Sequence, residues 1–538
     1  MKKLLPVILI FISSCCSFAQ NYQWAKAAGW IGQDGARSVA VDADGNVYVA
    51  GQYGGYSQFD TIFCYGNGTY ESFLAKYNSA GDIQWVKHAG GPNEDYATGV
   101  CIDAAGFIYI TGYFLDSIFF DTVKLESADL TDIFIAKYTP AGELVWAKRA
   151  GGRGDDHSYA ITADPHGDVA IAGQFSGTAT FDFNFVTSSG DYDEFIAKYG
   201  NNGICQWVKK GGGSNDDAAK GISSDAAGNF YITGYIYGNT MIDTVHLNTT
   251  SPTSTDIFIA KYLSWGDFVW AKKCDSYLGD NPYGIATDWE GNSYLTGYFQ
   301  NVTTFGTHTI QAHGYNDAFL VKYNTDGDCD WAKAIGGNDL DIGTSVCTDD
   351  YGCVYLTGFF DTEIFFDDTT YIAEGYEVFV AKYWWNGDEI WTQIGGGAGN
   401  DFGNAIGVND AGELAVAGYY NLYGYFGPYI LPLTQEQDIF VVKLSNPVGI
   451  NETLVNEFAS VYPNPAKGEI TLEADFDKNQ VLNISVTDAM GNVVINSVEK
   501  PQNTKVKLLF NTETCNGIYF LNVYNNSQFF SGKIILNR

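Results

Sequence analysis

Seven aspartates recur along this chain at almost constant spacing, and their carboxylates are the first candidates for chemistry. Successive members are 60 to 63 residues apart, and each stands just before a segment rich in β-branched residues. They are Asp34, Asp95, Asp156, Asp217, Asp280, Asp341 and Asp401. Ca²⁺ prefers oxygen ligands, so a ring of seven carboxylates predicts a site for this cation. The alternative is structural, because an aspartate in such a position commonly caps its own turn by accepting backbone hydrogen bonds.

A second set of residues breaks the periodicity and suggests recognition of an anion. The chain has four arginines, and Arg37, Arg149 and Arg153 fall in or beside the segments that carry the repeated aspartates. His157 is close to two of them in sequence. Guanidinium groups recognise carboxylates and phosphates, so this set predicts a pocket for an anionic ligand such as an acidic glycan. The alternative is that these side chains balance the charge of the neighbouring aspartates.

The sequence contains none of the common catalytic motifs. It has no Gly-x-Ser-x-Gly elbow, phosphate-binding loop, His-Glu-x-x-His or dinucleotide-binding glycine pattern. The six histidines are scattered, and His308 and His313, which share one variable segment, are interpreted as solvated loop residues rather than metal ligands. We therefore expect no catalytic and no cofactor-binding residues, with Ca²⁺ as the one candidate cofactor.

The elements that must position these side chains are short antiparallel strands. A tryptophan recurs with the same spacing of 60 to 63 residues, and each interval holds four segments rich in β-branched and aromatic residues. Gly, Asn, Asp and Pro separate these segments, as in residues 97–151. Such segments are typical of strands joined by tight turns, and no helical periodicity competes with them. The pattern predicts an all-β fold built from one repeated unit.

The number of repeats predicts a closed ring. The third-strand segment occurs seven times, but its last copy, residues 438–444, has no tryptophan strand after it. The first tryptophan strand, residues 22–28, has no unit before it. The N-terminal strand would therefore supply the missing strand of the last unit, which hides the sheet edges. We predict a seven-bladed β-propeller over residues 21–446, with the N-terminal strand closing the last blade.

The N-terminal residues predict export. Residues 1–20 contain two lysines, an apolar stretch and a small-residue cleavage site ending at Ala19, which together are typical of a secretory signal peptide. A lipobox-like sequence that ends at Cys15 leaves a lipidated product open as an alternative. Export permits disulfides, and Cys347 and Cys353 are close enough in sequence to bridge a β-hairpin.

The composition excludes some classes of partner. The chain carries 29 Lys+Arg against 63 Asp+Glu, a formal net charge of −34. Such a charge argues against nucleic acid, whose phosphates need cationic partners, and against anionic membrane surfaces. No segment beyond residue 20 reaches the roughly 18 apolar residues needed to span a bilayer, so we expect no transmembrane segment.

The composition changes after residue 446. Residues 447–457 are interpreted as a linker, and residues 458–538 contain short alternating strands that predict a small immunoglobulin-like β-sandwich. This last segment opens with Tyr-Pro-Asn-Pro at 462–465 and contains Gly-Ile-Tyr-Phe-Leu at 517–521. It resembles the type A sorting domain of the type IX secretion system of Bacteroidetes. The resemblance implies that the type IX secretion machinery is a partner through residues 458–538, and that the protein is secreted or attached to the outer-membrane surface.

The repeats also resemble the SBBP β-propeller repeats of bacterial surface proteins. The resemblance depends on the phrase Asp-x-x-Gly-Asn-x-Tyr-x-Thr/Ala-Gly, with clear copies at residues 42–51 and 225–234. It implies a propeller at the cell surface and no defined reaction. We expect a non-catalytic binding, adhesion or scaffold module for an extracellular glycan or protein. The alternatives are an extracellular polysaccharide hydrolase or lyase on the same scaffold, and a cation-stabilised structural surface protein.

Overall fold

A computed structural model describes residues 22–366, 369–434 and 436–445 of the chain. Beyond them it describes 459–462, 466–467, 469–474, 482–488, 493–499, 505–510, 517–524 and 529–536. The secondary structure of these residues is entirely β, which confirms the all-β fold class. The predicted signal peptide with Cys15 and the predicted linker at 447–457 lie outside the described residues. The chain divides into two compact units, one ending at Asn446 and the other beginning at Pro447.

The larger unit repeats a four-stranded antiparallel sheet seven times, and we number these sheets from the N-terminus as units 1 to 7. The first strands of the units are β2 (Gly35–Val41), β8 (Asp95–Ile102), β12 (Asp156–Ala163), β16 (Ala218–Ser224), β22 (Asn281–Thr287), β28 (Asp341–Thr348) and β32 (Phe402–Val408). The second strands are β3 (Val47–Tyr53), β9 (Ile108–Phe120), β13 (Val169–Phe181), β17 (Phe230–Tyr237), β23 (Ser293–Phe299), β29 (Cys353–Phe366) and β33 (Leu414–Tyr420).

The outer half of each sheet holds the third and fourth strands. The third strands are β6 (Glu71–Tyr77), β10 (Val123–Tyr138), β14 (Asn184–Tyr199), β20 (Thr255–Tyr262), β26 (Asp317–Tyr323), β30 (Thr369–Trp384) and β36 (Asp438–Leu444). The fourth strands are β7 (Ile83–Gly90), β11 (Leu144–Gly152), β15 (Cys205–Gly213), β21 (Phe268–Ser276), β27 (Cys329–Ile335), β31 (Glu389–Gly395) and, for unit 7, β1 (Tyr22–Ile31). The second and third strands are the most completely buried, since both faces of their sheets are covered by neighbouring units.

Hairpins between the second and third strands join each unit to the one before it. In four units they are separate strand pairs: β4 (Tyr56–Phe59) with β5 (Ile62–Tyr65), β18 (Asn239–Ile242) with β19 (Val245–Asn248), β24 (Val302–Phe305) with β25 (His308–Gln311), and β34 (Tyr425–Phe426) with β35 (Tyr429–Ile430). Each hairpin pairs with the fourth strand of the preceding unit, as β18 does with β15 and β4 does with β1. These sequence-variable segments therefore have a structural role as staples between units.

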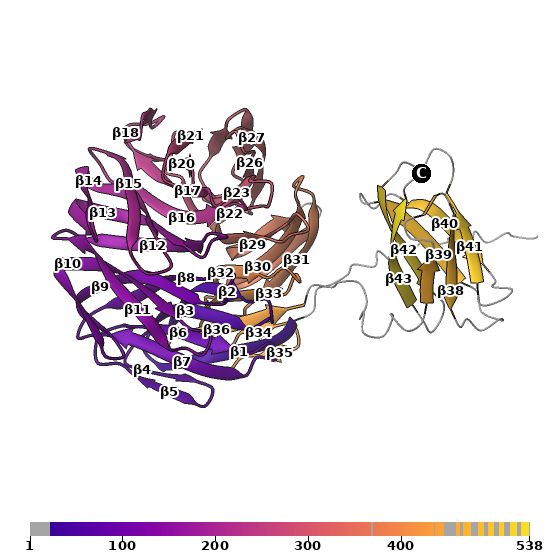
Figure 1. The fold of residues 1–538 in the computed structure, drawn as a ribbon, viewed down its shortest axis with the longest axis horizontal. Helices are drawn as coiled ribbons and strands as arrows, with labels where there is room; N and C mark the ends of the chain where they lie inside the picture. Colours follow the sequence, from indigo (N-terminus) through magenta and orange to yellow (C-terminus); the bar gives the residue numbers. More distant parts are fainter. Residues whose placement is uncertain are drawn as a thin grey trace, which may run out of the picture. The chain divides into compact units, whose positions relative to one another are not determined.

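The first strands lie side by side in a closed circle. Each is in contact with the first strand of the next unit, and β32 of unit 7 returns to β2 of unit 1. Figure 1 shows these strands toward the middle of the larger unit, with β5, β10 and β18 at its periphery. The N-terminal β1 pairs antiparallel with β36, so the two ends of the larger unit share one sheet, as the repeat count predicts.

Hydrogen bonds of the repeated tryptophans link the units in the same circular order. The indole N–H of Trp146 in unit 2 donates to the backbone carbonyl of Asn201 in unit 3, at 3.1 Å. Trp24 in unit 7 makes the equivalent bond to the carbonyl of Ser79 in unit 1, also at 3.1 Å. Unit 1 therefore follows unit 7 in the same way that unit 3 follows unit 2.

The smaller unit contains two antiparallel sheets. One is formed by β37 (Ala459–Tyr462), β38 (Glu469–Ala474) and β41 (Lys505–Leu509). The other is formed by β40 (Val493–Glu499), β39 (Leu482–Asp488), β42 (Gly517–Tyr524) and β43 (Phe529–Leu536). Ile470 of the first sheet and Ile484 of the second are fully buried.

The cysteines of the described residues have free thiols. The bridge suggested for Cys347 and Cys353 is therefore not formed. The register explains this, because Cys347 lies opposite Tyr355 and Cys353 lies opposite Trp384 on the other side of β29. In the part of the chain that the structure describes, we find no helix with the length and hydropathy that crossing a membrane requires.

Candidate functional site

The seven repeated aspartates stand at the start of the first strands, and each is fully buried. Every one of them accepts at least one backbone hydrogen bond within its own unit or from the fourth strand leading into it. In five units the donor is the N–H of a glycine four residues earlier, at 2.6 Å for Gly213 to Asp217 and for Gly337 to Asp341. These hydrogen bonds fix the backbone conformation where the chain enters each first strand.

Each of these aspartates also interacts electrostatically with a second carboxylate, which lies on the third strand of the preceding unit. Gly29 separates Asp34 from Asp438: a Cβ on Gly29 would lie 2.2 Å from Asp438 Oδ1 and 2.9 Å from Asp34 Oδ2. Burial raises the pKa of Asp34 to about 8 and the pKa of Asp438 to about 6, and the charge of Asp438 adds to the effect on Asp34. Within the described residues, no three His, Cys, Asp or Glu side chains gather as a metal site would require.

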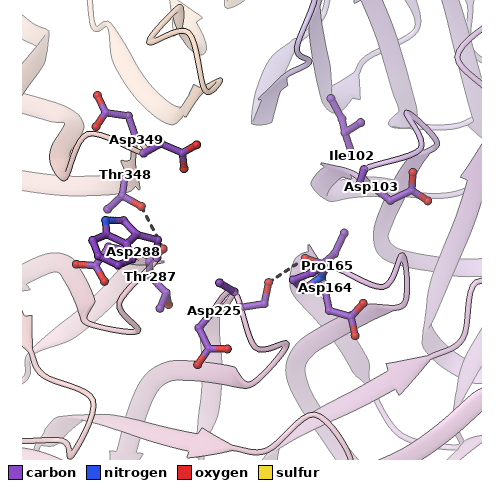
Figure 2. A pocket seen from close by; sticks show the side chains of 15 residues that line it. Ile102, Asp103, Asp164, Pro165, Asp225, Thr287, Asp288, Thr348 and Asp349 are labelled. Carbon is purple, nitrogen blue, oxygen red and sulfur yellow. Dashed lines mark hydrogen bonds between the residues drawn. The ribbon is translucent and has the colours of Figure 1, made fainter. Parts of the chain in front are cut away.

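A cavity of about 340 Å³ lies where the first strands end, and its rim is acidic. This rim contains Asp350 and five aspartates that each open the turn between a first and a second strand: Asp103, Asp164, Asp225, Asp288 and Asp349. Figure 2 shows the carboxylates of Asp103, Asp164 and Asp225 turned away from the middle of the cavity.

Local bonds occupy these carboxylates. Asp225 accepts from the backbone N–H groups of Ala227 and Asn229 and from the hydroxyl of Tyr231. The Lys198 ammonium lies 2.8 Å from Asp164 Oδ2. The acidic rim is thus accounted for by turn capping and ion pairs.

A second cavity, of about 190 Å³, lies where the first strands begin, at the opposite end of the same strands. Here each first strand contains a β-bulge that leaves one residue without a partner in the second strand. The bulged residues are Arg37, Thr98, Tyr159, Lys220, Tyr283, Thr344 and Asn404. All seven line this cavity, and we call them the bulge ring. A bulge re-aims the side chain of its extra residue, which explains how one position in every unit reaches the same space.

The bulge ring carries positive charge and no acid. Its two cations are Arg37 of unit 1 and Lys220 of unit 4, and no Asp or Glu is among the residues that line the cavity. The Arg37 Nε–H donates to Gln52 Oε1 at 2.6 Å, and its guanidinium lies 5.2 Å from the centre of the Tyr96 ring. The Lys220 ammonium lies 3.5 Å from the centre of the Tyr159 ring. Burial lowers the pKa of Lys220 to about 8, since the charged form loses water.

Aromatic rings form two arcs beside the bulge ring. In the first arc, Tyr96 packs against Tyr113 with centroids 5.1 Å apart, and Tyr113 packs against His157 at 4.2 Å. In the second arc, Phe402 packs against Phe359 at 4.3 Å and against Tyr419 at 4.7 Å. Tyr96, His157 and Phe402 each stand two residues before a bulge, so the arcs border the same end of the first strands.

Of the four residues that the sequence suggested for an anion pocket, only Arg37 lines this cavity. Arg149 in β11 pairs with the buried Asp132 of the neighbouring β10 strand, which neutralises its charge. Arg153 is exposed in the loop that follows β11.

His157 belongs to the first aromatic arc rather than to a set of cations. Burial lowers its pKa to about 4, against the opposing charge of Asp155, so its ring is neutral at pH 7. Its Nε2 lies 2.9 Å from Thr131 Oγ1. The second cation of the cavity is therefore Lys220, and not Arg149, Arg153 or His157 as the sequence suggested. Lys220 lies 183 residues from Arg37 in sequence.

Sequence reasoning missed six of the seven members of the bulge ring. The signal was present, because each member stands exactly three residues after a repeated aspartate. Five residue types fill these seven equivalent positions, while the aspartates before them do not vary. Variation inside an otherwise regular repeat marks the positions that the fold itself does not constrain.

Two curated proteins match parts of the sequence. An uncharacterized WD repeat-containing protein of Acanthamoeba polyphaga mimivirus is 26% identical over 454 residues, which cover 68% of this chain and 32% of that protein. The regulatory protein FlaEY of Caulobacter vibrioides is 31% identical over 98 residues, which cover 18% of this chain and 10% of that protein. The chain thus spans a third or less of the length of these relatives.

Two solved bacterial structures show distant likeness. A member of the DUF4221 family from Bacteroides vulgatus aligns with a TM-score of 0.33 and 8% identity, covering 80% of this chain and 98% of its own. PorZ of Porphyromonas gingivalis, a surface component of the type IX secretion system, aligns with a TM-score of 0.17 and 10% identity, covering 96% of this chain and 100% of its own.

The C-terminal segment has a specific match. Residues 460–537 fit the family described as secretion system C-terminal sorting domain. This segment coincides with the smaller unit of two antiparallel sheets. The chain therefore carries, in residues 460–537, a sorting domain of the type IX secretion system, which marks it for export to the cell surface or the medium.

Proposed function

We propose that this protein is an extracellular recognition module: a seven-bladed β-propeller of residues 21–446 that binds a glycan or protein ligand at the bulge ring without transforming it. Residues 1–20 would act as a signal peptide for the inner membrane, and residues 458–538 would engage the type IX machinery for the outer membrane. The repeats would belong to the SBBP type of surface propeller.

The bulge ring is the observation that carries this proposal. All seven units place their bulged side chain around one cavity, and these side chains differ between units. A purely structural ring would be expected to repeat one residue type, as the capping aspartates do. A ring of different polar and aromatic groups on a rigid scaffold is suited to the recognition of one asymmetric ligand.

The geometry also favours binding over catalysis. Hydrolysis of a glycosidic bond commonly needs a pair of carboxyl groups that flank the bond. The residues that line the cavity include no Asp, Glu or His. The repeated aspartates are fully buried and are not among the residues that line this cavity.

A glycan array combined with product analysis tests this function. The full-length protein is applied to immobilised glycans, and the same glycans in solution are incubated with it and analysed for cleavage. The expected result is binding without product, weakened in Tyr283→Ala, whose bulged ring is 42% exposed, and unchanged in Tyr315→Ala, whose ring is 81% exposed in an outer loop. Release of product would show an enzyme instead, and equal binding by both variants would place recognition elsewhere.

A further inference from the structure

We propose that the ligand of the bulge ring is an acidic saccharide whose carboxylate groups are recognised by Arg37 and Lys220. This inference rests on the proposed recognition function and names its ligand class. The two cations belong to units 1 and 4, and both line the same cavity of about 190 Å³.

The first argument is the placement of charge. The chain has 63 acids and 29 Lys and Arg residues, yet the residues around this cavity include two cations and no acid. Among the described residues, the Lys220 ammonium has no carboxylate partner, and its contacts are the rings of Tyr159 and Tyr235. Holding an ammonium group away from water and from any carboxylate costs stability, which an anionic ligand would offset.

The second argument is the orientation of Arg37. Its Nε–H is tied to Gln52, and its plane lies beside the Tyr96 ring. Within the described residues, the two terminal nitrogens of this guanidinium have no hydrogen-bond partner. They are thus left for a planar, two-oxygen acceptor, for which the guanidinium fork is suited.

The third argument is the shape and lining of the cavity. Six buried aliphatic residues are among those that line it: Val39, Ile161, Ile222, Ile285, Val346 and Ile406. The space is well below the roughly 300–1,000 Å³ of typical drug-sized pockets, so it suits one terminal sugar ring rather than a threaded chain. The aromatic arcs begin two residues before the bulges, and their rings are the apolar surfaces against which the C–H groups of the next sugar rings would pack.

An acidic peptide is the competing ligand, because it also presents carboxylates. The structure favours the saccharide because the lining at the level of the bulges includes the polar side chains of Thr98, Thr344 and Asn404. Hydroxyl-rich sugars match such a lining, and the aromatic arcs match their apolar faces.

Calorimetric titration of the full-length protein tests the proposal. The probes are an oligogalacturonide, the neutral galactose oligosaccharide of equal length, and a poly-glutamate peptide. We expect the oligogalacturonide to bind and the other two to bind at least tenfold more weakly. Arg37→Gln and Lys220→Gln should each lower its affinity by about tenfold or more, as the loss of a charged hydrogen bond does. Lys124→Gln, which removes a charge from an outer hairpin, should leave the affinity unchanged.

The pH dependence supplies a second readout. Lys220 faces the rings of Tyr159 and Tyr235 and lies near His157, which is neutral above pH 5. Since the pKa of Lys220 is about 8 without ligand, affinity should be nearly constant from pH 6 to 7 and should fall above pH 8 toward that of Lys220→Gln. Lys220→Arg should retain binding and lose this decline.

The outcomes separate this inference from the proposed function. If the neutral oligosaccharide binds as tightly and Tyr283→Ala weakens it, the bulge ring is a recognition site but the acidic ligand is wrong. If the poly-glutamate peptide binds best, the ligand is an acidic peptide and the proposed saccharide class is wrong. If the oligogalacturonide binds equally to wild type, Arg37→Gln and Lys220→Gln, the inference is overturned.

Discussion

The Lys220 ammonium lies 3.5 Å from the centre of the Tyr159 ring, one unit away, and this is its shortest described contact. A cation on an aromatic face is stabilised by about 1–2 kcal/mol when it is removed from water. Burial acts in the opposite direction and lowers the pKa of Lys220 to about 8, because the charged form loses water. We therefore expect the charge of Lys220, a member of the bulge ring, to reduce the stability of the folded state.

Lys220→Met should consequently stabilise the protein while lowering its affinity for the anion by about tenfold or more. Desolvation costs about 1.4 kcal/mol per pKa unit, and the lost cation–π contact offsets part of this, so we expect a gain of about 1–2 kcal/mol at pH 7. Urea unfolding followed by tryptophan fluorescence measures the change. Lys124→Met, at an exposed site on β10, is the matched control and should leave the midpoint unchanged. A destabilised Lys220→Met would mean that the lysine is a structural element.

The buried carboxyl pairs should make the protein less stable as the pH rises from 5 to 8. Burial raises the pKa of Asp34, Asp95 and Asp341 to about 8, so the folded state keeps protons that the unfolded chain releases above about pH 4. The stability from these protons is complete below pH 4 and is lost as the pH passes through 8. Thermal melts at half-unit intervals should show a falling melting temperature, with a shallower fall in Asp34→Asn than in the exposed control Asp44→Asn.

The effect of calcium on the melting temperature tests whether the same carboxyl pairs bind a cation. If they share protons, 5 mM CaCl₂ and 5 mM EDTA should give the same melting temperature at pH 8. If a cation holds each pair together, calcium should raise the melting temperature and remove the pH dependence, because the metal would replace the proton. The measurement is a melt at pH 6 and pH 8 in each buffer, with Asp34→Asn beside the wild type.

Trp24 should matter as much as a tryptophan in the middle of the repeat. It is 6% exposed and bonds to Ser79 across the junction of units 7 and 1. Trp24→Ala and Trp331→Ala should each lower the free energy of unfolding by about 3–5 kcal/mol, as large-to-small core changes do. Deletion of residues 22–31 should in addition expose the edge of β36, and light scattering should detect association. A nearly neutral Trp24→Ala would show that the ring does not depend on its N-terminal strand.

Asp225 should prove structural and not functional. Its carboxylate accepts two backbone hydrogen bonds and one from Tyr231, so Asp225→Ala should cost about 2–4 kcal/mol. Ligand affinity at pH 7 should remain within about twofold of wild type, since the acidic rim is at the other end of the first strands. Chemical unfolding and calorimetry check the two halves of this prediction. A selective loss of binding would move the site to the acidic rim.

Removal of residues 458–538 should block export. In a bacterium with a type IX system, the truncated chain should remain in the periplasm, whereas the full chain should reach the surface or the medium. Immunoblots of periplasm, outer membrane and medium measure this distribution. The truncated chain should show an unchanged melting transition for residues 21–446, because the two compact units have separate cores. Export of the truncated chain would contradict the sorting role.

Much of the larger unit could be predicted because its information is local and repeated. The spacing of Trp24, Trp85 and their successors marks the fourth strands, and the turn residues after Asp42 or Asp225 mark the hairpins. The count of third strands predicted the pairing of residues 22–28 with 438–444. The bridge between Cys347 and Cys353 was not predictable in this way, since their proximity in sequence says nothing of the register that separates them.

The sequence by itself determined the strands, their number, their order and the capping role open to Asp34 and its equivalents, because each depends on residues a few positions apart. Only the tertiary structure decided which side chains meet. A bulge exists only relative to a paired strand. Arg37 and Lys220 are therefore bulged residues only because β2 pairs with β3 and β16 pairs with β17. The circular arrangement of the units then brings these two cations, which are far apart in the chain, to one cavity whose lining contains no Asp or Glu. Arg149 instead forms an ion pair with Asp132 in the adjacent strand.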